Sequence, residues 1–245
     1  MIVVTGGTHG IGLAVVSQLA AQGHAVAFTG RDRAAGQALA ARTAGASFLQ
    51  ADAADAAAVD AAIQHILSLS GGKVSGLVNN AGTSARSRFL DTTVQEWDRV
   101  MAVNTRATFQ FTRGLLPALI ESGGAVVNVA SIAGKVGEEG LAAYCASKGA
   151  VISMTQALAL EYGENVRFNA VCPGQIGTRM MERITADPAR LSALTRRIPA
   201  ARLGEPREVA DVVCWLLSPQ ASYVNGAVLT IDGGETAGYR TPPAP

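Results

Sequence analysis

The stretch IVVTGGTHGIGLAVVSQLAA, residues 2–21, decides the fold of this 245-residue chain. A β-branched run (2–5) leads into a glycine-rich turn, which opens into an apolar, helix-forming segment (11–21). Glycines at such a turn let the backbone approach a pyrophosphate, and the amino end of the following helix stabilises its negative charge. The glycine spacing is G-x-x-x-G-x-G rather than G-x-G-x-x-G. We therefore expect a strand–loop–helix unit that binds a dinucleotide, with a purely structural turn as the alternative.

The same alternation continues along the chain. The sequence predicts further strands at 25–29, 46–50, 74–79, 125–130, 166–171 and 228–231, and helices at 34–43, 56–69 and 142–162. Another helix begins at a capping box formed by Thr93 and Glu96. The strands are apolar on both faces, as parallel strands between two helix layers must be. This pattern predicts an α/β fold, a Rossmann-type doubly wound seven-stranded parallel sheet with helices on both faces.

Neither a repeat nor a linker divides the chain, so we expect one dinucleotide-binding and catalytic domain over residues 1–238. The Arg-rich stretch 175–204 is interrupted by Pro188 and Pro199, and we expect it to form a lid over the substrate. Residues 239–245 contain successive prolines, which cannot donate to a sheet, so we expect an extended or disordered tail.

Composition excludes several classes of protein. Apolar residues make up 49% of the chain and charged residues 16%, which excludes low-complexity disorder. The net charge of +1 provides no basic surface for nucleic acid. No apolar run approaches the roughly 18 residues of a membrane span, and the first residues do not resemble a signal peptide. The three cysteines lack C-x-x-C spacing, which favours reduced thiols in the cytoplasm over disulfides or a metal site.

The end of the second strand indicates which dinucleotide is preferred. An NAD site places an acidic residue about 20 residues after the loop, where it holds the ribose 2′-hydroxyl. Here Gly30 occupies that position, and the guanidinium of Arg31 can pair with the extra phosphate of NADP. We expect a preference for NADP(H), with NAD(H) as the alternative cofactor. In the alternative interpretation Arg31 is a solvated partner of Asp32.

Tyr144 and Lys148 are spaced i and i+4 on the helix predicted at 142–162, and so share one face. A nearby cation lowers the pKa of a tyrosine from about 10, which suits proton transfer to or from an alcohol or carbonyl oxygen. Ser131 ends the strand at 125–130, and Asn79–Gly82 and Pro173–Gly174 end neighbouring strands. Ligands bind at the carboxyl ends of strands in open α/β sheets, so these residues are expected to meet.

With these residues the sequence resembles the classical short-chain dehydrogenase/reductase family, and the resemblance covers essentially the whole chain. The shared motifs are TGGTHGIG (5–12), Asp52, NNAG (79–82), Asn104, Ser131, YCASK (144–148), PG (173–174) and IDGG (231–234). Within the family the chain is similar to 3-oxoacyl-carrier-protein reductases and their relatives. The resemblance implies an oxidoreductase that reduces a ketone to a secondary alcohol by hydride transfer from NADPH.

The resemblance also implies roles for individual residues. Tyr144 would protonate the carbonyl oxygen, and Ser131 would hydrogen-bond that oxygen. Lys148 would lower the pKa of Tyr144 and hold the cofactor ribose, and Asn104 would support a water-linked proton relay to Lys148. Cofactor contacts are further implied for Gly6, Thr8, His9, Gly10, Ile11, Gly12, Arg31, Asp52, Ala53, Asn80, Ala81, Gly82, Tyr144, Lys148, Pro173, Gly174, Ile176 and Thr178.

Two residues depart from the family pattern. His9 stands where NADP-preferring relatives often carry Arg or Lys, so one contact with the 2′-phosphate is expected to be weaker; a surface turn residue is the alternative. Leu141 is apolar where carrier-protein reductases often carry Gln or Asn, which favours a different or more apolar substrate.

The partners and the rival functions stay open at this point. Arginines could attract an anionic or carrier-bound substrate, or could simply form a solvated surface; they are Arg86, Arg88, Arg179, Arg183, Arg190, Arg196, Arg197 and Arg202. Members of the family commonly form homotetramers, and a homodimer is the alternative. The rival functions are an NAD-linked alcohol dehydrogenase and a non-catalytic nucleotide-sensing regulator.

Overall fold

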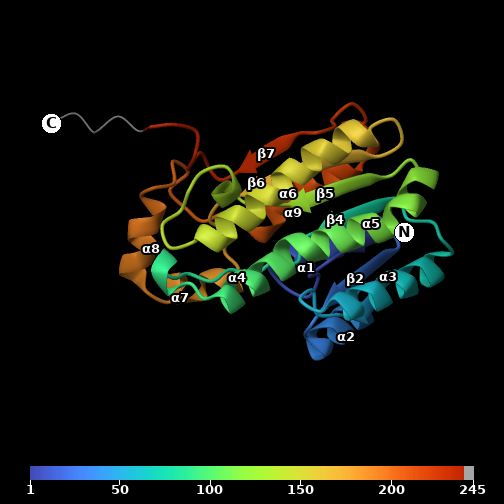
Figure 1. Cartoon of the computed structure of the whole chain (residues 1–245), viewed down its shortest axis with the longest axis horizontal. Helices are drawn as coiled ribbons and strands as arrows, with labels where there is room; N and C mark the ends of the chain where they lie inside the picture. The colour runs from blue at the N-terminus through green and yellow to red at the C-terminus, as the bar shows by residue number, and fades with distance from the viewer. Residues whose placement is uncertain (240–245) are drawn as a thin grey trace.

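A computed structural model describes residues 1–239 of the chain. Seven parallel strands form one sheet in the order β3-β2-β1-β4-β5-β6-β7 (Figure 1). The strands are β1 (Ile2–Val4), β2 (Val26–Gly30), β3 (Ala46–Gln50), β4 (Gly76–Asn79), β5 (Ala125–Val129), β6 (Arg167–Pro173) and β7 (Val228–Ile231). The strand order reverses between β1 and β4, which is the topological switch point where such sheets bind ligands. The predicted doubly wound parallel sheet is confirmed.

Helices cover both faces of this sheet. One layer consists of α1 (Gly10–Ala21), α2 (Arg33–Arg42) and α9 (Pro206–Leu217). The other consists of α3 (Ala56–Ser70), α5 (Ala107–Glu121) and α6 (Ala142–Glu161), of which α5 and α6 lie across the near face in Figure 1. Side chains of one strand alternate between two cores: Ile2 and Val4 pack with the first layer, Val3 with the second. Burial on both faces explains the apolar character of the strands.

The predicted strands and helices end within two residues of the observed ones, apart from the helix that follows Thr93. There α4 (Val94–Met101) passes through a five-residue π-helical turn, Ala102–Arg106, into α5. The predicted capping box is present, since Glu96 N donates to Thr93 Oγ1 at 3.1 Å and Thr93 N to Glu96 Oε2 at 3.3 Å. Single π turns within helices often mark functional positions, and this one contains Asn104.

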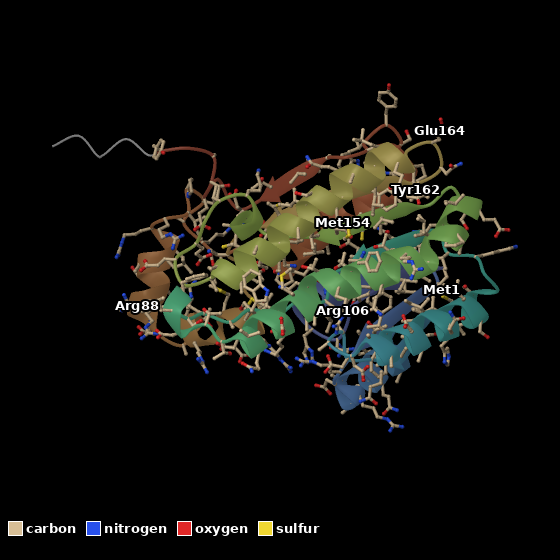
Figure 2. The ribbon with its side chains drawn as sticks, viewed as in Figure 1. Met1, Arg88, Arg106, Met154, Tyr162 and Glu164 are labelled. Carbon is tan, nitrogen blue, oxygen red and sulfur yellow. The ribbon has the colours of Figure 1, made fainter. Side chains whose placement is uncertain are left out.

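The Arg-rich stretch after β6 contains two short helices, α7 (Glu182–Thr185) and α8 (Pro188–Thr195). Pro188 does not interrupt this segment as predicted. It begins α8, because the first helical position needs no N–H donor, and the Asp187 side chain caps the same helix. In Figure 2, Arg88 lies at the end of the molecule that carries α7 and α8, and Met1 lies at the opposite end. The segment that was predicted to form a lid therefore lies at the carboxyl ends of the strands.

The tail predicted at 239–245 lies outside the described residues except for Tyr239, which is exposed. Within residues 1–239, none of the helices combines the length and the apolar character that crossing a membrane requires.

Candidate active site

The glycine loop joins β1 to α1 and can adopt its shape only with glycine. Gly6 and Gly10 have φ angles of +66° and +54°, where side chains are disfavoured. A Cβ atom on Gly12 would lie 2.2 Å from Gly6 O. Asn80, at the end of β4, holds the loop from the other side by donating from Nδ2 to Thr5 O and Gly6 O, both at 3.0 Å. The Asn80 side chain therefore stabilises the glycine loop, in addition to its predicted contact with the cofactor.

The amino end of α1 is suited to an anion. His9 is its N-cap residue but makes no side-chain capping hydrogen bond, so the first helical N–H groups are left for another acceptor. Thr178 crosses the loop from beyond β6, since a Cβ on Gly10 would lie 3.0 Å from Thr178 Cγ2. A close-packed glycine turn beneath an uncapped helix end fits a pyrophosphate, and hence the dinucleotide that was predicted.

The far end of the loop carries the residues predicted to select the cofactor. Thr8 Oγ1 lies 2.9 Å from His9 Nδ1, and His9 Nε2 lies 3.7 Å from Asp32 Oδ2. Asp32 also caps α2. The alternative in which Arg31 pairs with Asp32 is wrong, because the Asp32 carboxylate faces the helix end and His9. Among residues 1–239, none pairs with the exposed Arg31 guanidinium.

The other predicted cofactor residues lie at the carboxyl ends of neighbouring strands. They are Asp52 and Ala53 after β3, Ala81 and Gly82 after β4, and Pro173, Gly174 and Ile176 at the end of β6. The backbone N–H of Ala81 donates to Thr5 Oγ1 at 3.0 Å, which ties β4 to the glycine loop.

Ser131, Tyr144 and Lys148 meet at the carboxyl end of β5. Ser131 follows this strand, and its side chain hydrogen-bonds to the Tyr144 phenol. The Lys148 Nζ atom lies 5.9 Å from the centre of the Tyr144 ring. Lys148 is buried, and its ammonium donates to Val129 O at 2.7 Å. The structure thus brings together a hydroxyl, a phenol and an ammonium around one point.

Asn104 adjoins this group and is held by Thr83 and Ser147, of which the sequence did not single out Thr83. A Cβ on Gly82 would lie 3.6 Å from both Asn104 Oδ1 and Lys148 Nζ. Asn104 Oδ1 accepts from Thr83 N at 2.8 Å, and its Nδ2 donates to Thr83 O and to Ser147 Oγ, both at 2.9 Å. Ser147 lies within the YCASK motif, but no local pattern in the sequence predicts its hydrogen bond to Asn104, which is 43 residues away.

Burial controls the protonation of these groups. It raises the pKa of the Tyr144 phenol, while the Ser131 hydrogen bond acts in the opposite direction and the Glu138 carboxylate raises it further. Lys148 was expected to lower the pKa of Tyr144, but desolvation outweighs any such effect and the net shift is upward. Burial also lowers the pKa of Lys148 to about 8. The tyrosine is therefore protonated at neutral pH, and the lysine is charged there.

Known proteins are similar to this chain in sequence and in fold. A family model described as enoyl-(acyl carrier protein) reductase matches residues 6–236. The chain is 39% identical to 2-(S)-hydroxypropyl-CoM dehydrogenase 3 of Xanthobacter autotrophicus, over 97% of this chain and 96% of that protein. The chain is a member of the classical short-chain dehydrogenase/reductase family.

Two further relatives support the membership of this short-chain dehydrogenase/reductase in the family. Cyclopentanol dehydrogenase of Comamonas sp. is 39% identical, over 97% of both chains. The structure described as "Pseudomonas aeruginosa RhlG/NADP active-site complex" is 33% identical and superposes with a TM-score of 0.88, covering 96% of this chain and 95% of that one. The protein is therefore an NAD(P)-dependent oxidoreductase that acts on CH–OH or C=O groups of a small molecule.

The segment predicted to form a lid, residues 175–204, and the loop after β4 are less positive than their sequences indicate. Four of the eight arginines predicted to attract an anion form ion pairs, namely Arg86–Glu138, Arg190–Asp187, Arg197–Glu235 and Arg202–Glu208. Three of these four acids lie outside the lid segment in the sequence. A count of the charged residues within the segment 175–204 therefore does not include these three carboxylates.

Proposed function

We propose that this short-chain dehydrogenase/reductase reduces a ketone to a secondary alcohol, with Tyr144 as the general acid and NADPH as the preferred cofactor. The observation that carries the proposal is the convergence of Ser131, Tyr144 and Lys148 at the carboxyl end of β5. The bound cofactor supplies the hydride. The alternative is the reverse reaction, an NAD-linked oxidation of an alcohol.

Each residue has a role that follows from its surroundings. The raised pKa of Tyr144 keeps the phenol protonated at neutral pH, as a proton donor to a carbonyl oxygen must be. The Ser131 hydroxyl beside it supplies a second hydrogen bond to that oxygen. The buried Lys148 ammonium stabilises the phenolate that is left when the proton has been transferred. Asn104 supports a proton relay that returns a proton by way of Lys148.

Arg31 supports the preference for NADP(H). Its guanidinium is exposed and available to a phosphate, and Gly30 carries no carboxylate to repel one. The solved relative with 33% identity is described as a complex with NADP. The Asp32 carboxylate favours the alternative, NAD-linked oxidation. It lies 3.7 Å from His9, and its negative charge opposes a contact between His9 and the 2′-phosphate of NADP.

The substrate, the assembly and the compartment are part of the same proposal. The exposed Arg179 and Arg183 support an anionic or carrier-bound substrate, whereas the four ion pairs and the buried Leu141 support an uncharged one. Exposed apolar side chains on outer helices, Trp97, Phe109, Leu160 and Trp215, support a homotetramer or homodimer. The three free cysteines support a cytoplasmic location.

The test is consumption of NADPH and NADH by the purified protein with a panel of ketones, and their production from the matching alcohols. Wild type is compared with Tyr144→Phe and with the control Tyr162→Phe at the opposite end of α6. We expect Tyr144→Phe to lose roughly 10²–10⁴-fold in kcat, with NADPH affinity within about threefold, because only the proton donor is removed.

A Tyr144→Phe variant with most of its activity would refute the mechanism. NADPH binding without any turnover across the panel would favour the nucleotide-sensing regulator instead. Tyr162→Phe is expected to retain wild-type kcat.

A further inference from the structure

Arg106 joins the turn that carries Asn104 to the loop that follows β3. It is the last residue of the π-helical turn Ala102–Arg106, two residues after Asn104. Residues two apart in a helix project to opposite sides, so Arg106 points away from the active site while Asn104 faces it. In Figure 2 Arg106 lies where the start of α5 approaches α3, and its Nη2 donates to Ala54 O in the loop between β3 and α3. One helical turn therefore contacts both the reacting groups and this loop.

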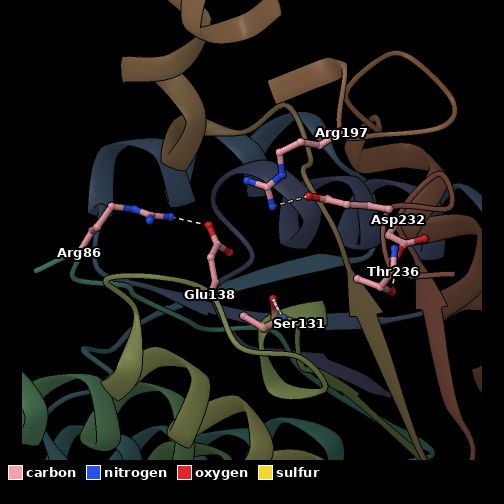
Figure 3. Close-up of polar contacts among 8 residues, drawn as sticks. Arg86, Ser131, Glu138, Arg197, Asp232 and Thr236 are labelled. Atoms are coloured by element: carbon pink, nitrogen blue, oxygen red, sulfur yellow. Dashed lines mark hydrogen bonds and ion pairs between the residues drawn. The ribbon is translucent and has the colours of Figure 1, made fainter. Parts of the chain in front are cut away.

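The Arg106 guanidinium bonds a main-chain carbonyl and no carboxylate. Arg86 and Arg197 are each paired with a glutamate (Figure 3), whereas Arg106 forms no ion pair within the described part of the chain. A charged donor makes a stronger hydrogen bond to a carbonyl than a neutral donor does. One turn further along α5, Gln110 Nε2 donates to Ala56 O at 3.3 Å. The start of α5 therefore holds this loop and the first residue of α3 at two points.

The peptide group that Arg106 binds also fixes Asp52. The amide of this peptide group, Asp55 N, donates to Asp52 O at 3.0 Å. Hydrogen bonds in series strengthen one another, so a cation on Ala54 O makes the Asp55 N–H a better donor. The preceding amide, Ala54 N, donates to Asp52 Oδ1 at 2.9 Å. The other carboxylate oxygen, Asp52 Oδ2, makes no hydrogen bond within residues 1–239 and is left for a ligand.

Asp52 lies on the adenosine side of the cofactor site. β3 pairs with β2 in parallel, with Gln50 opposite Gly30, and Ala51 N donates to Gly30 O at 3.1 Å. Gln50 Nε2 donates to Arg31 O at 3.2 Å. Asp52 therefore follows β3 beside the residue proposed to bind the 2′-phosphate of the adenosine ribose. An adenine amino group donates hydrogen bonds and an ionised carboxylate only accepts them, so Asp52 complements the base.

We propose that Arg106 is a positioning residue for the cofactor, which orients Asp52 toward the adenine of the bound dinucleotide by holding the Ala54 carbonyl. The proposal rests on the proposed function, because Asp52 is taken to bind a dinucleotide. Arg106 acts through Asp52, so its loss weakens cofactor binding and leaves the chemical step at Tyr144 unchanged.

The test is fluorescence titration of the protein with NADPH and with NADH, which share the adenosine. Arg106→Met keeps a long side chain but removes the donor. Its Kd for both cofactors should rise about threefold to tenfold, because Asp52 is correctly oriented for only part of the time. The kcat at saturating cofactor should stay within about twofold of wild type. Arg106→Lys restores one N–H donor and should return the Kd to within about twofold of wild type.

Arg113→Met is the matched control. Arg113 lies about two turns further along α5, is exposed, and makes no hydrogen bond or ion pair with another described residue. This substitution removes the same charge, so an effect of net charge on an anionic cofactor would appear in both methionine variants. The Kd of Arg113→Met should match that of wild type, and equal losses in the two variants would contradict the proposal.

A double-mutant cycle with Asp52→Ala shows whether Arg106 acts through Asp52. Adding Arg106→Met to Asp52→Ala should raise the Kd by less than about twofold, because the side chain that Arg106 orients is already absent. Fully additive losses, or an unchanged Kd in Arg106→Met, would overturn the proposal while cofactor binding and turnover by wild type leave the proposed function standing. A wild-type protein that binds neither cofactor would overturn both.

Discussion

Replacing Ser147 by alanine tests whether Asn104 must be held in place for catalysis. The Ser147 hydroxyl accepts from Asn104 Nδ2 at 2.9 Å and donates to Tyr144 O at 2.8 Å, and the residue is completely buried. Without it, one N–H of Asn104 has no partner. An unpaired buried donor costs about 1–3 kcal/mol of unfolding free energy. Each kcal/mol lowers the Tm of a protein of this size by about 2–4 °C.

The catalytic effect should exceed this structural one. An amide that has lost one of its three anchors samples other orientations, and misplacement equivalent to about 1.4 kcal/mol of the barrier lowers kcat about tenfold. The KM for NADPH should change less than twofold, because the glycine loop is not touched.

Thr155 provides a matched control on the same helix. Its hydroxyl accepts from Asn128 Nδ2 at 2.8 Å and donates to Val151 O at 2.7 Å, and Thr155 is also completely buried. Thr155→Val therefore removes an equivalent hydroxyl from an equivalent amide, but two turns of α6 away from Ser147. It should lose a similar amount of stability and keep its kcat.

The assay is thermal unfolding of wild type, Ser147→Ala and Thr155→Val, together with kcat and KM for NADPH at 25 °C. The reasoning would be refuted if both variants lost stability equally and both kept wild-type kcat. Equal losses of kcat in the two variants would likewise show that the effect is structural.

Three further predictions concern the cofactor and the proton donor. Arg31→Ala should lower kcat/KM for NADPH about tenfold to a hundredfold, because a hydrogen bond to a charged group is lost. The kcat/KM for NADH should stay within about twofold of wild type, and equal losses of kcat/KM with the two cofactors would contradict the prediction. Because burial lowers the pKa of Lys148 to about 8, its ammonium is charged below that pH and neutral above it. The kcat/KM for reduction should therefore fall as the pH rises above about 8, and a flat profile to pH 10 would contradict this. Gly12→Ala places a Cβ 2.2 Å from Gly6 O, so it should lower the Tm and weaken NADPH binding at least about tenfold, measured by fluorescence titration; unchanged binding would show that the loop can relax.

The local patterns of the sequence were sufficient for most of the fold. Apolar runs of strand length alternate with helical segments, and both signals depend only on near neighbours in the chain. The Thr93–Glu96 capping box formed as predicted for the same reason. Pro188 was misinterpreted because the same residue that breaks a helix in its interior also favours its first position.

The sequence by itself determined that Tyr144 and Lys148 share a helix face and that Ser131 and Asn80 lie at strand ends, because helix periodicity and parallel topology follow from local geometry. The tertiary structure alone decided the contacts around them. Arg86 and Glu138 are 52 residues apart, and Arg197 and Glu235 are 38 apart. Likewise, the upward shift of the Tyr144 pKa comes from burial, which no spacing of residues reveals. Pairing across the chain and loss of solvent exist only once all the elements have packed together.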